Sequence, residues 1–238
     1  MKLHLLGVNG PFPESHGATS GYLLEAGKEI YQIDFGCGIL SRLTSLAPPE
    51  NLSALFISHW HFDHTADIPV LMYRLEACRS SIPVYGPADP SSLVFSLVIS
   101  SGCFSFHEVS PGQEFTVRSM NVKAFPARHP VPSVGYRFEA EDKVLCYTGD
   151  TNTLDSLKQD CSTCDLLLSD GLFPASEWNE KKPHLSAQLS ALLAYESGAK
   201  RLIITHLNPF YPRRILLDEA RAIFPGAVLA ESGAVFVI

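Results

Sequence analysis

The stretch Ser58-His59-Trp60-His61-Phe62-Asp63-His64 places three imidazoles and one carboxylate within six residues, directly after an apolar run. Neutral imidazoles and carboxylates are ligands that zinc, manganese and iron accept. Alternate residues at a strand end point to the same side, so we expect His59 and His61 to face one metal. The chain must then turn for Asp63 and His64 to form a second, adjacent cluster. The spacing therefore predicts a centre for two metals, with the intervening aromatic residues packed away from it.

Length and composition indicate an ordinary globular protein. The chain has 238 residues, of which 46% are hydrophobic and 18% charged, and its mean hydropathy is +0.10. These values differ from those of disordered chains. No repeat of fixed period, low-complexity tract or linker interrupts the sequence. We therefore expect a single domain over residues 1–238.

Charge and cysteine usage narrow the classes of partner and compartment. The formal net charge of −7 argues against broad capture of nucleic acid, which needs clustered Lys and Arg. The apolar stretch 3–8 is broken at once by Asn9-Gly10-Pro11, so we expect no signal peptide, and no run approaches the roughly eighteen apolar residues of a membrane span. The six cysteines are scattered, and Cys161-x-x-Cys164 is interpreted as loop cysteines in preference to a redox or zinc site. A cytoplasmic protein without a membrane partner is expected.

Apolar runs and turn residues alternate along the chain, which predicts helices packed outside a sheet. Strands are expected at 2–8, 21–26, 29–34, 52–58, 82–86, 104–108, 114–117, 120–125, 143–147, 165–170, 201–205, 228–229 and 235–238, with one more after the loop at His129. Helices are expected at 39–47, 67–78, 90–100, 153–159, 186–197 and 216–224.

Polar side chains stand at the ends of these expected strands. His59, Asp150, Asp170 and His206 each follow an apolar run, and His129 lies in a Pro-flanked loop before a strand. Sheet scaffolds assemble active sites from polar residues placed in this way. We therefore expect these five side chains to meet in one site.

Asp34 also ends an apolar run and is followed by glycines that allow a close backbone approach. Two interpretations of Asp34 remain open from the sequence: a turn-forming acid, and a residue that supports the site.

The order His59-x-His61-x-Asp63-His64, then His129, Asp150 and His206, resembles the metallo-β-lactamase superfamily of hydrolases. The resemblance extends over essentially the whole chain and includes Thr-Gly-Asp-Thr at 148–151 and Thr-His-Leu at 205–207. It implies an α/β fold, a four-layer αββα sandwich with a dinuclear site at one edge of its two sheets. Members of the family also form dimers, and the sequence leaves a homodimer open.

The same resemblance implies the ligand set. One metal would be held by His59, His61 and His129, and the other by Asp63, His64 and His206, with Asp150 bridging them. Two divalent ions about 3.5 to 4 Å apart lower the pKa of a shared water, so a bridging hydroxide would be the nucleophile. Zinc is the first expectation and manganese or iron the alternatives. The redox branch of the superfamily carries Glu where this chain has His61, which favours hydrolysis.

Three further features resemble the ribonuclease Z-like phosphodiesterase branch: Gly135-Tyr136-Arg137, the acid Asp170, and His184 before a helix. The resemblance implies that Asp170 orients His184, which would donate a proton to the departing oxygen; with Asp63, these two are the expected catalytic residues. The family acid is usually Glu, so the shorter Asp170 has less reach. The alternative for His184 is a surface residue at an ordinary helix start.

The tRNA-processing members carry a Gly/Pro-rich arm, and no such insertion is present here. Together with the acidic net charge, this argues against a tRNA substrate. The closer likeness is to small bacterial hydrolases whose opening resembles Ala18-Thr19-Ser20-Gly21-Tyr22-Leu23, which implies a small phosphodiester, such as a cyclic nucleotide. The alternatives are a lactone or thioester hydrolase using the same site, and a metal-binding protein without enzymatic activity.

Overall fold

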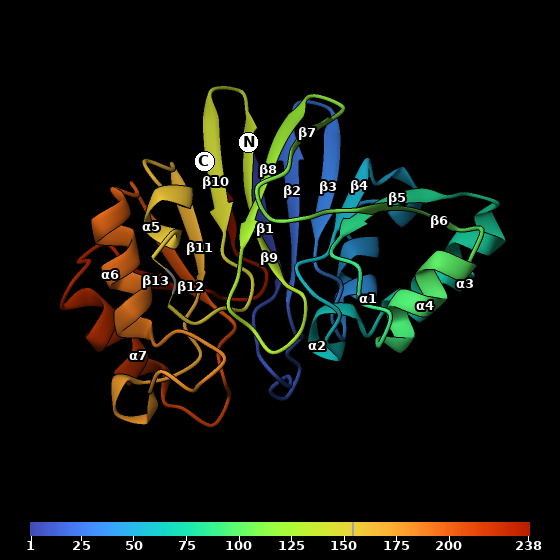
Figure 1. The fold of residues 1–238 in the computed structure, drawn as a ribbon. Helices are drawn as coiled ribbons and strands as arrows, with labels where there is room; N and C mark the ends of the chain where they lie inside the picture. The colour runs from blue at the N-terminus through green and yellow to red at the C-terminus, as the bar shows by residue number, and fades with distance from the viewer. Residues whose placement is uncertain (154) are drawn as a thin grey trace.

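In the computed structural model, which describes residues 1–153 and 155–238, the described strands form two seven-stranded sheets that face each other (Figure 1). The first sheet has the order β14 (Val235–Val237), β1 (Lys2–Gly7), β2 (Gly21–Ala26), β3 (Glu29–Ile33), β4 (Ala54–Phe56), β5 (Ile82–Gly86) and β6 (Phe104–Glu108). The second has the order β13 (Val228–Leu229), β12 (Leu202–Thr205), β11 (Leu166–Asp170), β10 (Lys143–Tyr147), β9 (Val134–Ala140), β8 (Met120–Pro126) and β7 (Glu114–Val117).

Helices cover the outer faces of both sheets, as Figure 1 shows. Beside the first sheet lie α1 (Ile39–Thr44), α2 (Phe62–Thr65), α3 (Ile68–Cys78) and α4 (Leu93–Ser100). Beside the second lie α5 (Leu157–Asp160), α6 (Ala187–Ser197) and α7 (Arg213–Arg221). Short 3-10 turns occupy Pro49–Asn51 and Ala175–Glu177. The expected four-layer αββα sandwich is confirmed.

Three apolar layers hold this arrangement together. The central layer lies between the sheets and is rich in aromatic side chains, with Phe56 contacting Tyr136 and Phe138 at ring-centroid distances of 5.6 and 5.0 Å. One outer layer packs the first sheet against α1, α3 and α4, and the other packs the second sheet against α5, α6 and α7. Each sheet is therefore buried on both faces, which explains why its central strands are apolar runs.

Local signals explain where several elements begin and end. Gly27 has φ +61° in the turn between β2 and β3, a conformation that glycine adopts without a steric cost. The Ser186 hydroxyl accepts a hydrogen bond from Leu189 N at 3.1 Å and caps α6, whose other end closes at Gly198 with φ +68°. The expected helix at 186–197 is therefore correct to within one residue.

Other boundaries were expected wrongly. The helices expected at 39–47 and 90–100 are shorter. The first ends at Thr44, where Ser45 N donates to Arg42 O, and the second begins only at Leu93, where the Ser92 hydroxyl accepts a hydrogen bond from Phe95 N at 3.3 Å and caps the helix. The helix expected at 216–224 begins three residues earlier, at Arg213, directly after Pro212. In the region expected to be helical at 153–159, the structure gives only Leu157–Asp160 and residue 154 lies outside the described residues.

Parallel pairing positions the candidate site. β3 pairs in parallel with β4 in the first sheet, and β10, β11 and β12 are parallel in the second. The carboxyl ends of parallel strands share one edge of a sheet, so the residues after them lie together. This edge is the lower one in Figure 1, where α2 and the loops after β10 and β12 meet. None of the described helices combines the length and the apolar character needed to cross a bilayer.

Candidate metal centre

The motif that follows β4 is held by a buried tryptophan and a short helix. Trp60 is 3% exposed and its indole Nε1 donates a hydrogen bond to Pro87 O at 2.7 Å. The next residues wind into α2, where the Thr65 hydroxyl donates to His61 O at 2.9 Å. The turn brings Asp63 and His64 back beside His59, as the spacing predicts.

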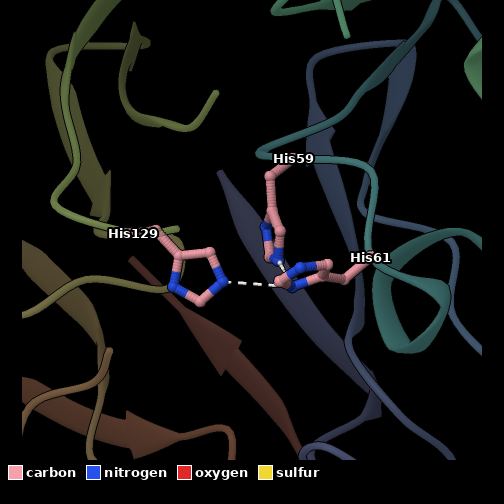
Figure 2. A group of neighbouring side chains, drawn as sticks. All are labelled: His59, His61 and His129. Carbon is pink, nitrogen blue, oxygen red and sulfur yellow. Dashed lines mark hydrogen bonds between the residues drawn. The ribbon is translucent and has the colours of Figure 1, made fainter. Parts of the chain in front are cut away.

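Three imidazoles form a first cluster (Figure 2). His61 Nδ1 lies 3.0 Å from His59 Nε2 and also 3.0 Å from His129 Nε2. His129 arrives from the loop after β8, and its other nitrogen, Nδ1, lies 3.2 Å from the carbonyl of Pro183. One ring nitrogen carries at most one hydrogen, so hydrogen bonding satisfies at most one of the two contacts at His61. A cation shared by the three lone pairs satisfies all of them.

A second cluster contains Asp63, His64, Asp150 and His206. The Asp150 oxygen Oδ2 lies 3.2 Å from His64 Nε2 and 3.4 Å from His206 Nε2. The same oxygen lies 3.5 Å from His59 Nε2 in the first cluster, so Asp150 touches both. Asp63 Oδ2 lies 3.0 Å from His206 Nε2.

Burial keeps the first cluster neutral. It lowers the pKa of His59 well below its usual value and that of His129 to about 4, and it also lowers the pKa of His61. Neutral imidazole is the form that binds a metal. The first cluster is therefore ready to accept a cation at neutral pH without losing a proton.

In the second cluster the pKa shifts favour the charged forms of the side chains. Burial opposes the ionisation of Asp150, but His206 and His64 outweigh it and hold the pKa of that carboxyl well below its usual range. Burial likewise lowers the pKa of His64, but the carboxylates of Asp150 and Asp34 outweigh it and raise that pKa well above the usual value. A metal at this cluster must therefore displace a proton.

The donor atoms fit divalent cations. Asp150 is 2% exposed, and its second oxygen, Oδ1, has no hydrogen-bond partner in the described part of the chain. A buried carboxylate oxygen without a partner is costly, and a bound cation removes that cost. Imidazole and carboxylate donors together suit zinc, manganese and iron.

Asp34 supports the second cluster and also turns the backbone, so both interpretations of this residue hold. Its carboxylate accepts hydrogen bonds from Ser58 N at 2.8 Å, Ser58 Oγ at 2.9 Å and Tyr147 OH at 2.6 Å. His64 Nδ1 lies 2.8 Å from the same carboxylate, which directs Nε2 toward Asp150. Asp34 also has φ +52°, so it turns the backbone as well.

His184 and Asp170 form a buried pair. His184 Nδ1 lies 2.9 Å from Asp170 Oδ2, and the His184 side chain is 10% exposed, which contradicts the alternative of a surface residue. The His184 ring stacks on His206 with centroids 4.8 Å apart. Burial lowers the pKa of His184, but the carboxylates of Asp170 and Asp150 outweigh it and raise that pKa to about 9. The shorter acid therefore reaches its partner.

Comparison with known proteins decides the family. A family model described as "Beta-lactamase superfamily domain" matches residues 31–207. The chain belongs to the metallo-β-lactamase superfamily. Over 243 residues it is 31% identical to the probable metallo-hydrolase YhfI of Bacillus subtilis (strain 168), covering 99% of each protein. The crystal structure of that protein matches with a TM-score of 0.93 at 30% identity, covering 99% of this chain and 98% of the other.

More distant relatives share the fold. Ribonuclease Z of Methanosarcina acetivorans is 24% identical over 293 residues, covering 97% of this chain and 96% of the other. The short form of human tRNase Z has a TM-score of 0.82 at 21% identity, covering 100% and 99% of the two chains. Membership in this superfamily of metallo-hydrolases supports hydrolase activity and the binding of divalent metals at the clusters described above.

Two further features of the motif regions have roles that the sequence analysis did not assign. Gly135-Tyr136-Arg137 supports the scaffold: Tyr136 OH donates to Ile57 O at 2.9 Å, and Arg137 pairs with Glu139 at 2.6 Å. Phe62 was expected to pack away from the site, but it is 63% exposed, because α2 is a single turn with one face toward solvent.

Gly10 is a site residue that sequence reasoning missed, because Asn9-Gly10-Pro11 was interpreted only as the end of a strand. A Cβ added at Gly10 would lie 2.0 Å from His206 Nε2. The signal in the sequence was a glycine flanked by turn residues, which does not by itself reveal what the backbone approaches.

Proposed function

We propose that this protein is a dinuclear metal-dependent phosphodiesterase that acts on a small phosphodiester, such as a cyclic nucleotide. The observation that carries the proposal is the His184–Asp170 pair, which lies beside two clusters that share Asp150. Metal clusters alone suit many hydrolytic reactions, whereas a buried acid–histidine pair at their side suits protonation of a departing oxygen.

In this proposal His59, His61 and His129 would hold one ion, and Asp63, His64 and His206 would hold the other, with Asp150 available to both. When bound, the two ions, zinc as the first candidate, supply an activated water nucleophile and charge neutralisation of the phosphate. The imidazoles of the first cluster stay neutral, and Asp34 fixes the ring of His64. The first cluster thus provides ligands in the protonation state that binding requires, whereas the second must release a proton from His64.

His184 is the proposed proton donor. Asp170 accepts from Nδ1 and so fixes the ring orientation, which leaves Nε2 for the leaving oxygen. The Asp170 carboxylate is itself fixed, since Oδ2 accepts from Thr151 N at 3.1 Å and Oδ1 from Leu172 N at 3.2 Å. A proton donor whose ring is held by a carboxylate that is itself hydrogen-bonded needs little reorganisation when the substrate reacts.

Two observations favour a small substrate. The net charge of −7 disfavours a long polyanion. The alignment with the Methanosarcina acetivorans ribonuclease Z runs over 293 positions, more than the 238 residues present here, which fits segments of that enzyme that this chain lacks. The name of that relative, a ribonuclease, supports phosphodiester chemistry, while these differences favour a smaller phosphodiester than tRNA.

The test is to replace His184 by Ala and by Gln and to measure metal content and turnover of a 3′,5′-cyclic nucleotide, whose departing alkoxide oxygen needs a proton. We expect two ions per chain in both variants and a loss of turnover of about 10² to 10⁴-fold. His107→Ala, an exposed histidine on β6, is the matched control and should leave turnover unchanged. Unchanged turnover in the His184 variants with metals retained would show that His184 is not the donor.

A substrate panel tests the reaction class. Zinc- and manganese-loaded protein is offered phosphodiesters, lactones and thioesters in parallel. Turnover of a lactone or thioester, with none of any phosphodiester, would contradict the proposal, and fewer than two ions per chain would contradict its dinuclear part.

A further inference from the structure

Phe210 is an exposed aromatic side chain in the loop that follows the candidate ligand His206. It is 80% exposed and follows His206 by four residues. Single exposed apolar residues are common on protein surfaces, so exposure alone needs no functional reason. Two other features of Phe210 suggest a function: its loop is tied to the chain next to His206, and its ring packs on Phe12.

The loop that carries Phe210 is tied to the N-terminal loop after β1. Leu207 N donates to Val8 O at 2.8 Å, and Gly10 N donates to Leu207 O at 3.2 Å. Gly10 packs so closely on His206 that an added Cβ would lie 2.0 Å from Nε2, the nitrogen that faces Asp63 and Asp150. The backbone of this loop therefore borders the metal-facing side of the second cluster.

Phe12 provides the support. Its ring centroid lies 4.8 Å from that of Phe210, with the planes at 58°. Phe12 is two residues from Gly10, so their Cα atoms are at most about 7.6 Å apart. Phe210 N donates to Asn208 Oδ1 at 2.9 Å, which fixes the backbone under the ring. The exposed Phe210 ring is thus held by the half-buried Phe12 ring, in a loop that begins at His206.

We propose that Phe210, supported by Phe12, is a platform on which a substrate stacks an aromatic ring, namely a nucleobase attached to the phosphate in the metal centre. The inference rests on the proposed function, which places that phosphate at the two clusters. A nucleobase presents a flat π-face of the kind that stacks on aromatic side chains. The platform determines specificity by favouring phosphate esters with a base over those without one.

The surroundings favour a small ligand over a second copy of the chain. Next to the platform, Arg213 pairs with Glu14 at 2.5 Å, and both side chains are exposed, at 38% and 45%. Charged residues at this position restrict the apolar surface around Phe210, whereas stable protein interfaces bury more than about 1,000 Å².

The test is calorimetric binding of adenosine monophosphate and ribose 5-phosphate to zinc-loaded protein. Both probes carry the same phosphate, and only the first carries a base. We expect adenosine monophosphate to bind on the order of 10 to 100-fold more tightly, and Phe210→Ala to remove this preference without changing the affinity for ribose 5-phosphate. Phe210→Trp should retain the preference and Phe210→Leu should lose it.

Tyr195→Ala is the matched control, because Tyr195 is 69% exposed on α6, and it should bind both probes as the wild type does. Equal or absent binding of the two probes to the wild type, or an equal loss of both in Phe210→Ala, would overturn the proposal. So would a change from dimer to monomer in Phe210→Ala with the base preference intact. A base preference that depends on Phe210 in a protein that cleaves no phosphodiester would support the platform and refute only the proposed function.

Discussion

Single residues set how closely the backbone approaches the candidate ligands and how those ligands are aimed. His59, His61, Asp63 and His64 were recognisable because ligand chemistry belongs to the residue type and their spacing is local. Asp34 and Gly10 act through distant partners, at His64 and His206. The residues next to them in the sequence indicate only turns. The sequence therefore left the role of Asp34 open and gave no sign of the role of Gly10.

Gly10→Ala tests the close approach to His206. The added Cβ would lie 2.0 Å from Nε2, so the imidazole or the loop must move away from Asp63. We expect one of two bound ions to be lost and turnover to fall at least about 100-fold, since a misplacement of about 1 Å can cost that much. Metal analysis and activity measure this effect. Gly102→Ala, where an added Cβ meets no atom within 4 Å, should change neither.

Asp34→Asn tests the support of His64. The amide replaces one acceptor oxygen by a donor, so it cannot satisfy His64 Nδ1, Tyr147 OH and the Ser58 donors together. We expect metal affinity to fall about 10 to 100-fold, measured by competition with a chelator. Asp165→Asn, at the start of β11 and thus at the opposite edge of the sheet, is the control. An unchanged affinity would mean that Asp34 serves only the backbone turn.

At the scale of elements, apolar runs and turn residues located the strands and most helices. Boundaries were less accurate where tertiary contacts end an element: β4 spans only Ala54–Phe56 within the expected 52–58, because the following residues leave the ladder to form the centre. The segment between β6 and β7 crosses from the first sheet to the second, which the alternation of apolar runs and turn residues did not predict. Periodicity describes the faces of an element and carries no information about which sheet it joins.

Replacing Asp165 tests how much its contacts stabilise the paired starts of β10 and β11. Its carboxylate accepts from Val144 N at 2.9 Å and Lys200 Nζ at 2.8 Å, and Lys200 holds the pKa of Asp165 below its usual value. A lowered pKa gives stabilisation that is present above the unfolded-state pKa and lost as the pH falls through the folded-state pKa. Asp165→Asn should therefore reduce the free energy of unfolding by up to about 1 kcal/mol at neutral pH, because Lys200 is solvent-exposed, and by less near pH 3.

Urea denaturation at both pH values measures the effect. Lys200→Met should show a loss with the same pH dependence, and the double variant should lose less than the sum of the two single variants. Additive losses would mean that the ion pair contributes nothing.

At the scale of the whole molecule, the candidate ligands join the two sheets. His59 to His64 follow β4 of the first sheet, whereas His129, Asp150 and His206 follow β8, β10 and β12 of the second. A metal bound by both groups is a cross-link that the unfolded chain lacks. Metal binding should therefore stabilise the fold as well as serve catalysis.

Metal loading should raise Tm, and more so as the pH rises from about 6.5 to 8. The pKa of His64 is raised by Asp150 and Asp34, so each added pH unit below that pKa removes a competing proton and strengthens metal binding up to about tenfold. A free metal concentration one hundred times Kd raises the free energy of unfolding by about 2.7 kcal/mol. Thermal melts with zinc and with chelator measure the difference. A zinc-dependent gain that does not change over this pH range would contradict the proton competition at His64.

The sequence by itself determined the ligand types, their local spacing and the alternation of strands and helices, and through these the superfamily and its αββα fold. Those properties depend on residue identity and on contacts between residues a few positions apart in the chain. Only the tertiary structure decided that Asp170 reaches His184, that Asp34 holds His64, that Gly10 abuts His206 and that Phe62 and Phe210 face solvent. The physical reason is that these distances join segments far apart in the chain, and they depend on how two twisted sheets pack.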